Sequence, residues 1–167
     1  EPKYLLPAID SLQKSRTMRL DAPQYLEALI AFYHRDYQAA LDHAAAAVHK
    51  APWLYEPVKL SGDVYLERAL QARDSGRYEV AEKEFAAAVH SFSEATTIGQ
   101  SDAEVYEGLA EAWVRQVETA LLRGQQVGAA YAAALAASDK IMIAEPQSVA
   151  GPLKQAFATM MTMATGG

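Results

Sequence analysis

The chain has 167 residues, no cysteine and a formal net charge of −6, and 51% of its residues are hydrophobic. The absence of cysteine excludes disulfides, thiolate metal sites and a cysteine nucleophile, and the acidic balance argues against a nucleic-acid surface or an anionic membrane surface. The hydrophobic content is too high for a disordered chain, and no uncharged run is long enough to cross a membrane.

The alanine content predicts helices. Alanine, which is the best helix former and a poor strand former, supplies 34 residues. Between Tyr37 and Val48 the packing residues recur three and four positions apart, which is the spacing of one helix face. No run alternates β-branched residues as a strand would. We therefore expect an all-α protein.

Proline, glycine and capping residues divide the chain into about eight predicted helices. The first covers about residues 3–15, inside an N-terminal helical segment at 3–19. The others are expected at about 23–34, 37–50, 57–74, 77–97, 103–122, 129–144 and 149–164. Because the connecting loops are short, consecutive helices should pack antiparallel. The chain does not begin with methionine and ends in two glycines, so we expect it to be part of a longer protein.

Three segments repeat one pattern. Each opens with a tyrosine just after a turn, at Tyr37, Tyr78 and Tyr131, and has an alanine three positions later. Two of the preceding helices also match each other, at 58–65 and 106–113. The segments resemble the tetratricopeptide repeat (TPR), a helix–turn–helix unit of about 34 residues.

The TPR resemblance implies a right-handed α-solenoid of stacked helix hairpins. It places three repeats at 21–54, 55–100 and 101–146 and a C-terminal capping helix at 147–165, all in one domain at 1–167. Tyr65 and Tyr78 lie 13 residues apart, where a plain repeat uses about 6. The extra residues make almost two helical turns, so we expect elongated hairpins.

A second resemblance is carried by two turns. The residues 51–56 with Gly62-Asp63, and the residues 98–107 with Trp113, are similar to the TPR region of some bacterial serine/threonine protein kinases. The chain itself has no kinase glycine-rich loop, His-Arg-Asp or Asp-Phe-Gly motif. The resemblance therefore implies a catalytic domain outside this chain.

No motif of catalytic or metal-binding chemistry stands out. The four histidines, none of which lies three or four residues from another, are His34, His43, His49 and His90. The chain has no His-Glu-x-x-His, no nucleophile elbow and no phosphate-cradling loop. We therefore expect no enzymatic activity, no metal and no cofactor.

In the TPR family the first helices of the hairpins line a concave groove that takes peptides or partner helices. Helical spacing selects the residues expected to face this groove and bind a partner. They are Tyr25, Leu29, Phe32 and Tyr33 in repeat one; Lys59, Asp63, Leu66, Leu70 and Arg73 in repeat two; and Glu104, Glu107, Glu111, Arg115 and Glu118 in repeat three. The expected groove is aromatic at one end, mixed in the middle and acidic at the other, which favours a protein or peptide partner carrying Lys or Arg.

Two other interpretations of the groove stay open. In the first, the aromatic side chains pack against the N-terminal helix through Leu5, Ile9 and Leu12, so that this helix fills the groove. In the second, the glutamates form an ordinary solvated helix face.

The last predicted helix also has two interpretations. One apolar stripe contains Val149, Leu153, Phe157, Met160 and Ala164. It fits a capping helix that covers repeat three, as terminal repeats need. In the alternative, Met160, Met161 and Met163 form an adaptable surface for another chain.

The leading hypothesis is an interaction module that binds a protein or peptide within a larger regulatory, signalling or assembly protein. The alternatives are a structural spacer or oligomerisation module, and a pocket for a small molecule or lipid between the long helices. We expect no nucleic-acid or membrane partner. Nothing at the amino end of this sequence resembles a signal peptide, but a part of a longer protein need not carry its localisation signals. The location is therefore open, with the cytoplasm favoured and the periplasm as the alternative.

Overall fold

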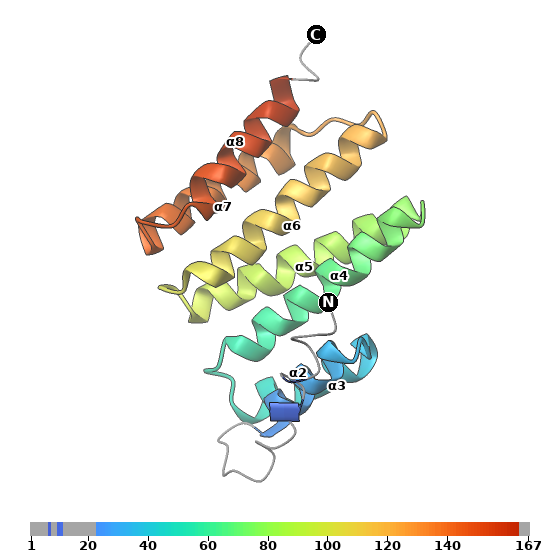
Figure 1. The fold of residues 1–167 in the computed structure, drawn as a ribbon, viewed down its shortest axis with the longest axis vertical. Helices are drawn as coiled ribbons and strands as arrows, with labels where there is room; N and C mark the ends of the chain where they lie inside the picture. The colour runs from blue at the N-terminus through green and yellow to red at the C-terminus, as the bar shows by residue number, and fades with distance from the viewer. Residues whose placement is uncertain (1–6, 8–9, 12–22, 164–167) are drawn as a thin grey trace.

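The computed structural model describes residues 7, 10–11 and 23–163, and these contain seven numbered helices and no strand. The helices are α2 (Pro23–Tyr33), α3 (Tyr37–Lys50), α4 (Glu56–Asp74), α5 (Tyr78–Ile98), α6 (Ala103–Leu122), α7 (Gly128–Ala144) and α8 (Ala150–Met163). They follow one another along the long axis of the molecule (Figure 1). The prediction of an all-α fold is confirmed.

The N-terminal helix expected at 3–19 lies largely outside the described residues. Pro7, Asp10 and Ser11 are described and are helical. The packing of Leu5, Ile9 and Leu12 against the groove therefore stays a prediction.

The helix limits expected from the sequence agree with those of α2 to α8 to within one residue. The residues that start these helices explain the agreement. Pro57 lies in the first turn of α4, where its missing N–H costs no hydrogen bond. Asp102 caps α6, because its carboxylate accepts a hydrogen bond from the Glu104 N–H at 2.9 Å.

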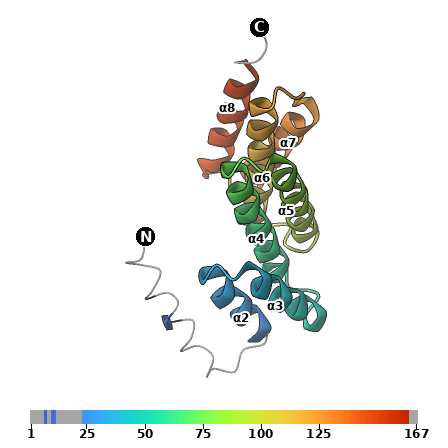
Figure 2. The same cartoon turned by 90° about the vertical axis from the view of Figure 1, so that its right-hand side faces the viewer.

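The helices form two layers of a solenoid. Each helix contacts the next one along the chain, and α2–α3, α4–α5 and α6–α7 form the first, second and third hairpins. In addition, α2 contacts α4, α4 contacts α6 and α6 contacts α8. Among the described helices, α3, α5 and α7 make no contacts with each other. Figure 2 shows α2, α4 and α8 on one side and α3, α5 and α7 on the other. We call the surface of α2, α4, α6 and α8 that faces away from α3, α5 and α7 the first-helix face.

The three hairpin turns share one geometry. Each contains a residue with a left-handed backbone, namely Arg35 (φ 62°), Gly76 (φ 72°) and Gly124 (φ 67°). In each, the following N–H bonds back to a carbonyl five residues earlier, and the three donor–acceptor pairs are Asp36–Ala31, Arg77–Ala72 and Gln125–Ala120. This hydrogen bonding is the Schellman motif, which ends a helix and reverses the chain.

Small residues let the helices approach closely, as the repeat pattern predicts. The alanines at the close-contact positions are all fully buried, namely Ala28, Ala40, Ala81, Ala110 and Ala134. Phe92 on α5 fills the space between Gly62 on α4 and Gly108 on α6. A Cβ atom on Gly62 would lie 2.8 Å from the Phe92 ring, and one on Gly108 only 2.4 Å from it.

The second and third hairpins are longer than the first. Helices α4 to α7 have 19, 21, 20 and 17 residues, whereas α2 and α3 have 11 and 14. This difference confirms the predicted elongation. None of the described helices is both long and apolar enough to cross a membrane.

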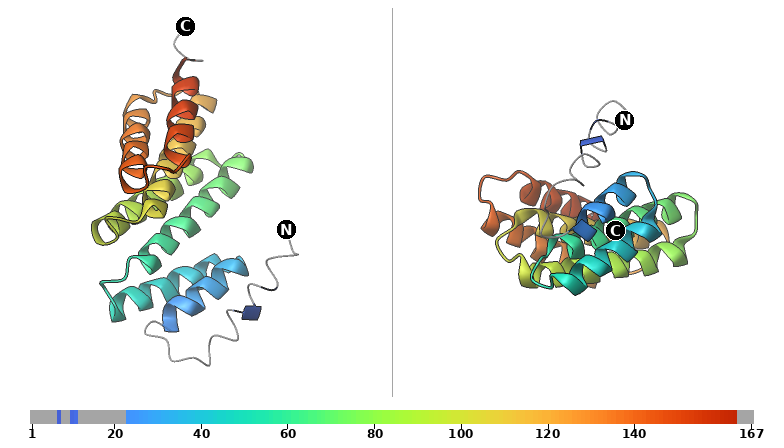
Figure 3. Two further views of the ribbon diagram at one scale, coloured as in Figure 1. Left: turned by 60° about the vertical axis from the view of Figure 1, so that its left-hand side comes forward. Right: turned by 90° about the horizontal axis from the view of Figure 1, so that it is seen from below.

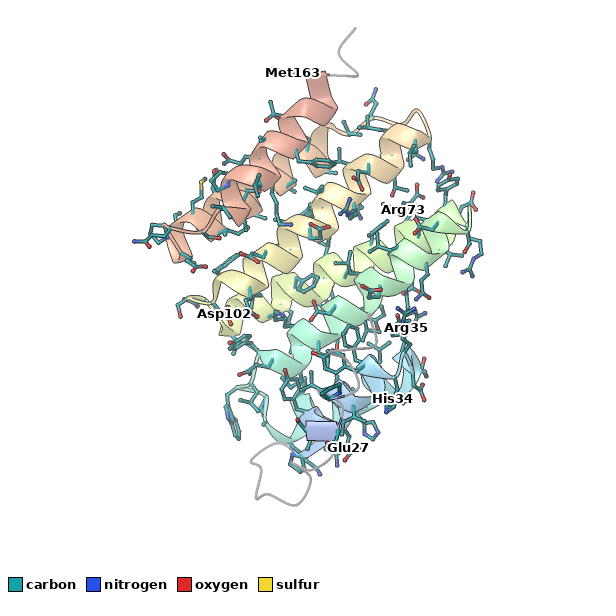
Figure 4. All side chains as sticks on the ribbon, viewed as in Figure 1. Glu27, His34, Arg35, Arg73, Asp102 and Met163 are labelled. Atoms are coloured by element: carbon teal, nitrogen blue, oxygen red, sulfur yellow. The ribbon has the colours of Figure 1, made fainter. Side chains whose placement is uncertain are left out.

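The residues that carry the second resemblance meet in space. The Tyr55 ring lies against Gly99, and its hydroxyl donates a hydrogen bond to Asp102, at the start of α6 in Figure 4. This hydrogen bond and burial raise the pKa of the Tyr55 hydroxyl above its ordinary value. The contact ties the turn before α4 to the turn before α6, so the motif has a structural role.

Candidate functional site on the first-helix face

All the residues expected to bind a partner lie on three neighbouring helices. Helix α2 carries Tyr25, Leu29, Phe32 and Tyr33; α4 carries Lys59, Asp63, Leu66, Leu70 and Arg73; and α6 carries Glu104, Glu107, Glu111, Arg115 and Glu118. Figure 1 looks onto this surface, with α4 in front of α5. The three sets form one continuous face because α2 contacts α4 and α4 contacts α6.

An aromatic hollow of about 180 Å³ lies between α2 and α4. Its lining consists of Tyr25, Leu29, Phe32, Tyr33, Glu56, Lys59, Leu60 and Asp63. Tyr25, Leu29 and Phe32 rest with one side on a core of Ala28, Ala44 and Leu60. Tyr33 is 38% exposed, and its ring centroid lies 5.7 Å from that of Phe32. These side chains therefore pack against the core on one side and line the hollow on the other.

Carboxylates outnumber cations at this hollow. The Lys59 Nζ lies 3.5 Å from the Asp63 carboxylate and 3.6 Å from that of Glu104 on α6. Glu56 has a buried Oε2 atom for which the described part of the chain provides no hydrogen bond. Burial raises the pKa of Asp63 above its ordinary value of 3.8 and outweighs the attraction of Lys59.

The same negative charge affects the pKa of the Tyr25 hydroxyl. Burial raises the pKa of its hydroxyl to about 12, and the charges of Glu56 and Asp63 add to the shift. Tyr25 therefore stays a neutral phenol in a hollow that Glu56 and Asp63 also line.

A second group of charges runs across α4, α6 and α8, and we call it the charge network. It consists of Arg73, Glu118, Arg115, Glu111 and Lys154. Arg73 bonds Glu118 at 3.1 Å, Arg115 bonds both Glu111 and Glu118 at 2.7 Å, and Lys154 bonds the second oxygen of Glu111. Figure 4 shows Arg73 at the far end of α4.

The charge network corrects the expectation of an acidic end on α6. It holds three cations and two carboxylates, and Arg73 also pairs with Asp74 at 3.0 Å, so Glu111 and Glu118 are neutralised by neighbours on three helices. Glu107 makes no ion pair within the described residues, and it accepts only a long hydrogen bond from Ser148 at 3.5 Å. Glu104 pairs with Lys59. Negative charge without a matching cation among the described residues therefore lies next to the aromatic hollow and at Glu107, whereas Glu111 and Glu118 at the opposite end of the face are paired.

Leu66 and Leu70 contribute to the core as well as to the face. Both are half-buried and pack against the cluster of Ala69, Ala72, Ala81 and Phe85 inside the long α4–α5 hairpin. Their position in the groove is therefore less exposed than the helical spacing suggests.

Two further hollows flank Arg115. One, of about 430 Å³, lies between α4 and α6 and includes Leu121 and Leu122. The other, of about 330 Å³, lies between α6 and α8 and is lined mostly by apolar atoms of Val114, Leu153, Ala156 and Phe157, beside Lys154. Sequence reasoning assigned Leu153 and Phe157 to a cap and missed Lys154 and Glu56. The apolar residues of α8 recur three and four positions apart, as they do on the first helices of the hairpins. This spacing could have indicated that α8 belongs to the same face.

A larger hollow, of about 780 Å³, lies outside the first-helix face, between α3 and α5 and next to α4. It is open, lined about equally by polar and apolar atoms, and includes none of the residues expected to bind a partner. Within the described ranges, no group of three His, Asp or Glu side chains is arranged to hold a metal ion.

Comparisons with known proteins support the fold. No protein-family model matches the chain, and no curated protein matches it. Among solved structures, the chain is similar to the Arabidopsis OM64 TPR domain, with a TM-score of 0.57 and 13% sequence identity. The match covers 92% of this chain and 96% of that one. The chain therefore has a TPR-like α-solenoid fold, and an identity this low establishes the fold alone.

Proposed function

We propose that the chain is a non-catalytic module that binds a protein or peptide along the first-helix face. The observation that carries the proposal is the row of three hollows along this face, in which aromatic and aliphatic side chains stay partly open beside charged ones. Partly exposed aromatic side chains next to charged groups are typical of binding anchors. A row of hollows between parallel helices suits an extended segment or a helix of a partner.

We also propose that this module is part of a larger protein. The resemblance of the turns at 51–56 and 98–107 to the TPR region of bacterial serine/threonine kinases supports a place in a larger regulatory or signalling protein. The repeat limits at 21–54, 55–100 and 101–146, the cap at 147–165 and the cytoplasmic location stay predictions. The flanking reading frame would test the proposed larger protein and the location.

Site-directed photo-cross-linking tests the binding face. Replacing Tyr33 or Glu107 with p-benzoylphenylalanine puts a photoreactive group on the first-helix face. The same substitution at Lys83 or His90, which are exposed on α5, puts it on the opposite layer. We expect a discrete cross-linked partner in the expressing cells from the first pair only. Cross-links from Lys83 and His90 alone, or equally from all four positions, would contradict the proposal.

A second candidate function is self-association through α8. Helix α8 lies at the end of the stack away from α2 and α3 (Figure 3). Three of the apolar side chains at this helix are largely exposed, namely Val149 (72%), Leu153 (65%) and Met163 (77%). A terminal repeat normally has a polar outer surface, so this exposure favours contact with another chain. A small-molecule pocket inside the hairpins is not favoured, because the large side chains of Phe85 and Phe92 are fully buried there.

A further inference from the structure

From the proposed function, on which this step rests, we infer that the aromatic hollow between α2 and α4 receives an arginine side chain of the partner. The sequence predicted that a basic residue of the partner binds at the glutamates of α6. The inference places this residue at the other end of the first-helix face, between α2 and α4. It also gives the bound segment an orientation, because the two ends of the face differ in charge.

The size of the hollow indicates a single side chain. Its volume of about 180 Å³ is below the ~300–1,000 Å³ of typical small-molecule sites. Its walls are the half-buried faces of Tyr25, Leu29 and Phe32, with Tyr33 more exposed at 38%. An arginine side chain suits such walls, because its methylene stem is apolar and its head is charged.

The charge of the hollow indicates a cation. Glu56, Lys59 and Asp63 line it, and Glu104 also pairs with Lys59, so the cluster has three carboxylates and one ammonium group. The distances from Lys59 to Asp63 and Glu104, at 3.5 and 3.6 Å, are long for direct ion pairs. The Glu56 Oε2 atom has no hydrogen-bond partner among the described residues. An incoming guanidinium would therefore meet carboxylate charge that Lys59 alone does not satisfy.

The aromatic rings favour arginine over lysine. A guanidinium group stacks on aromatic faces and bonds carboxylates through two parallel N–H groups, whereas an ammonium group acts as a point charge. Rings and carboxylates lie together in this hollow on the first-helix face. The two hollows beside Arg115 differ, because each is lined by two cations of the chain and only one carboxylate.

The test uses two short synthetic peptides that differ in one side chain. Both have a central residue flanked by leucine and alanine, which is arginine in one and citrulline, its uncharged isostere, in the other. Ring signals of Tyr25, Phe32 and Tyr33 are followed by NMR during titration. We expect the arginine peptide to shift these signals saturably and the citrulline peptide to bind at least about tenfold more weakly, as a lost charged hydrogen bond implies.

Matched variants locate the effect. Glu56→Gln combined with Asp63→Asn keeps the shape of the hollow and removes two charges, and burial already disfavours the charge of Asp63, so the fold should persist. This variant should weaken the arginine peptide about tenfold and leave the citrulline peptide unchanged. Glu94→Gln, at an exposed carboxylate on α5 in the opposite layer, should change neither. Tyr33→Ala, at an exposed ring, should weaken the arginine peptide even if the double variant fails to fold.

The outcomes separate this inference from the proposed function. Equal binding of the two peptides to the face would overturn the arginine preference and leave the interaction function standing. No shift of the three rings with either peptide would also overturn it, while cross-linking from Tyr33 and Glu107 decides the function independently. If replacing Lys14, Arg16 and Arg19 with alanine raised the affinity for the peptide, the occupant would be the chain's own N-terminal segment and the inference would be wrong.

Discussion

At the scale of single residues, Glu111 shows how a buried carboxylate is held in its charged form. Burial by itself would raise the pKa of Glu111, but the hydrogen bonds and charges of Lys154 and Arg115 outweigh it and lower the pKa below its ordinary value of 4.5. The carboxylate bonds Arg115 on its own helix and Lys154 on α8. Glu111 is therefore one of the residues that link the third hairpin to α8.

Glu111→Gln should reduce the free energy of unfolding by roughly 1–2 kcal/mol near neutral pH, because it leaves Lys154 without its carboxylate. A carboxyl whose folded pKa is lowered adds stability above its unfolded pKa, and this stability disappears as the pH falls through the folded pKa. The difference from the unsubstituted chain should therefore be full above about pH 4.5 and shrink below it. Urea unfolding followed by circular dichroism at neutral and acid pH measures it.

Glu107→Gln is the control for this prediction, because Glu107 lies on the same helix and makes only a 3.5 Å hydrogen bond with Ser148. It should change stability by less than about 0.5 kcal/mol at either pH. A loss for Glu111→Gln that is equal at neutral and acid pH would show that the charge is not responsible.

At the scale of elements, the stacking of the second hairpin on the third depends on one ring between two glycines. Phe92 on α5 is fully buried, and Gly62 and Gly108 bring the backbones of α4 and α6 against it. Glycine inside a helix costs about 1 kcal/mol relative to alanine. Its presence at both positions is explained by the close approach to the ring.

Gly108→Ala should therefore destabilise the fold by about 1–3 kcal/mol despite its better helix propensity, because the new methyl group would clash with the fully buried Phe92 ring. Adding Phe92→Leu should recover part of the loss, so the two substitutions should be less than additive in a double-mutant cycle. Gly128→Ala, where a Cβ meets nothing within 4 Å, is the control. Thermal unfolding that shows Gly108→Ala as stable as the unsubstituted chain would disprove the packing argument.

The elements themselves could be predicted from the sequence, because their signals are local. Pro57, Gly76 and Asp102 mark helix limits through backbone geometry that involves only neighbouring residues. The repeat pattern predicted which alanines are buried, since only small residues fit where hairpins stack.

The charge balance of the face could not be predicted, because it depends on pairs far apart in the chain. Lys154 meets Glu111 across 43 positions, and Arg73 meets Glu118 across 45. Counting glutamates on α6 therefore predicted an acidic end that the neighbouring helices neutralise. Glu56 was missed for a related reason, since helical spacing alone does not show which residue at the start of α4 turns towards α2.

At the scale of the whole molecule, α8 occupies the place of a first helix in a fourth hairpin. It contacts α6 as α6 contacts α4 and α4 contacts α2, and it also contacts α7. Its partners cover only part of its surface, which explains why Leu153 and Met163 remain 65% and 77% exposed. Apolar side chains gathered on a surface helix mark a site of contact with another chain.

If α8 is an interface between copies of this chain, the sedimentation coefficient should rise with protein concentration. Leu153→Glu should remove the rise, because a charge in the centre of an apolar contact is costly to bury. Trp53→Glu is the matched control, since Trp53 is similarly exposed at 70% but lies in the turn between α3 and α4. Both variants should stay folded, since neither side chain belongs to the buried core. A sedimentation coefficient that does not depend on concentration, or that responds equally to both variants, would eliminate self-association through α8 and leave the exposed leucine available to the partner on the first-helix face.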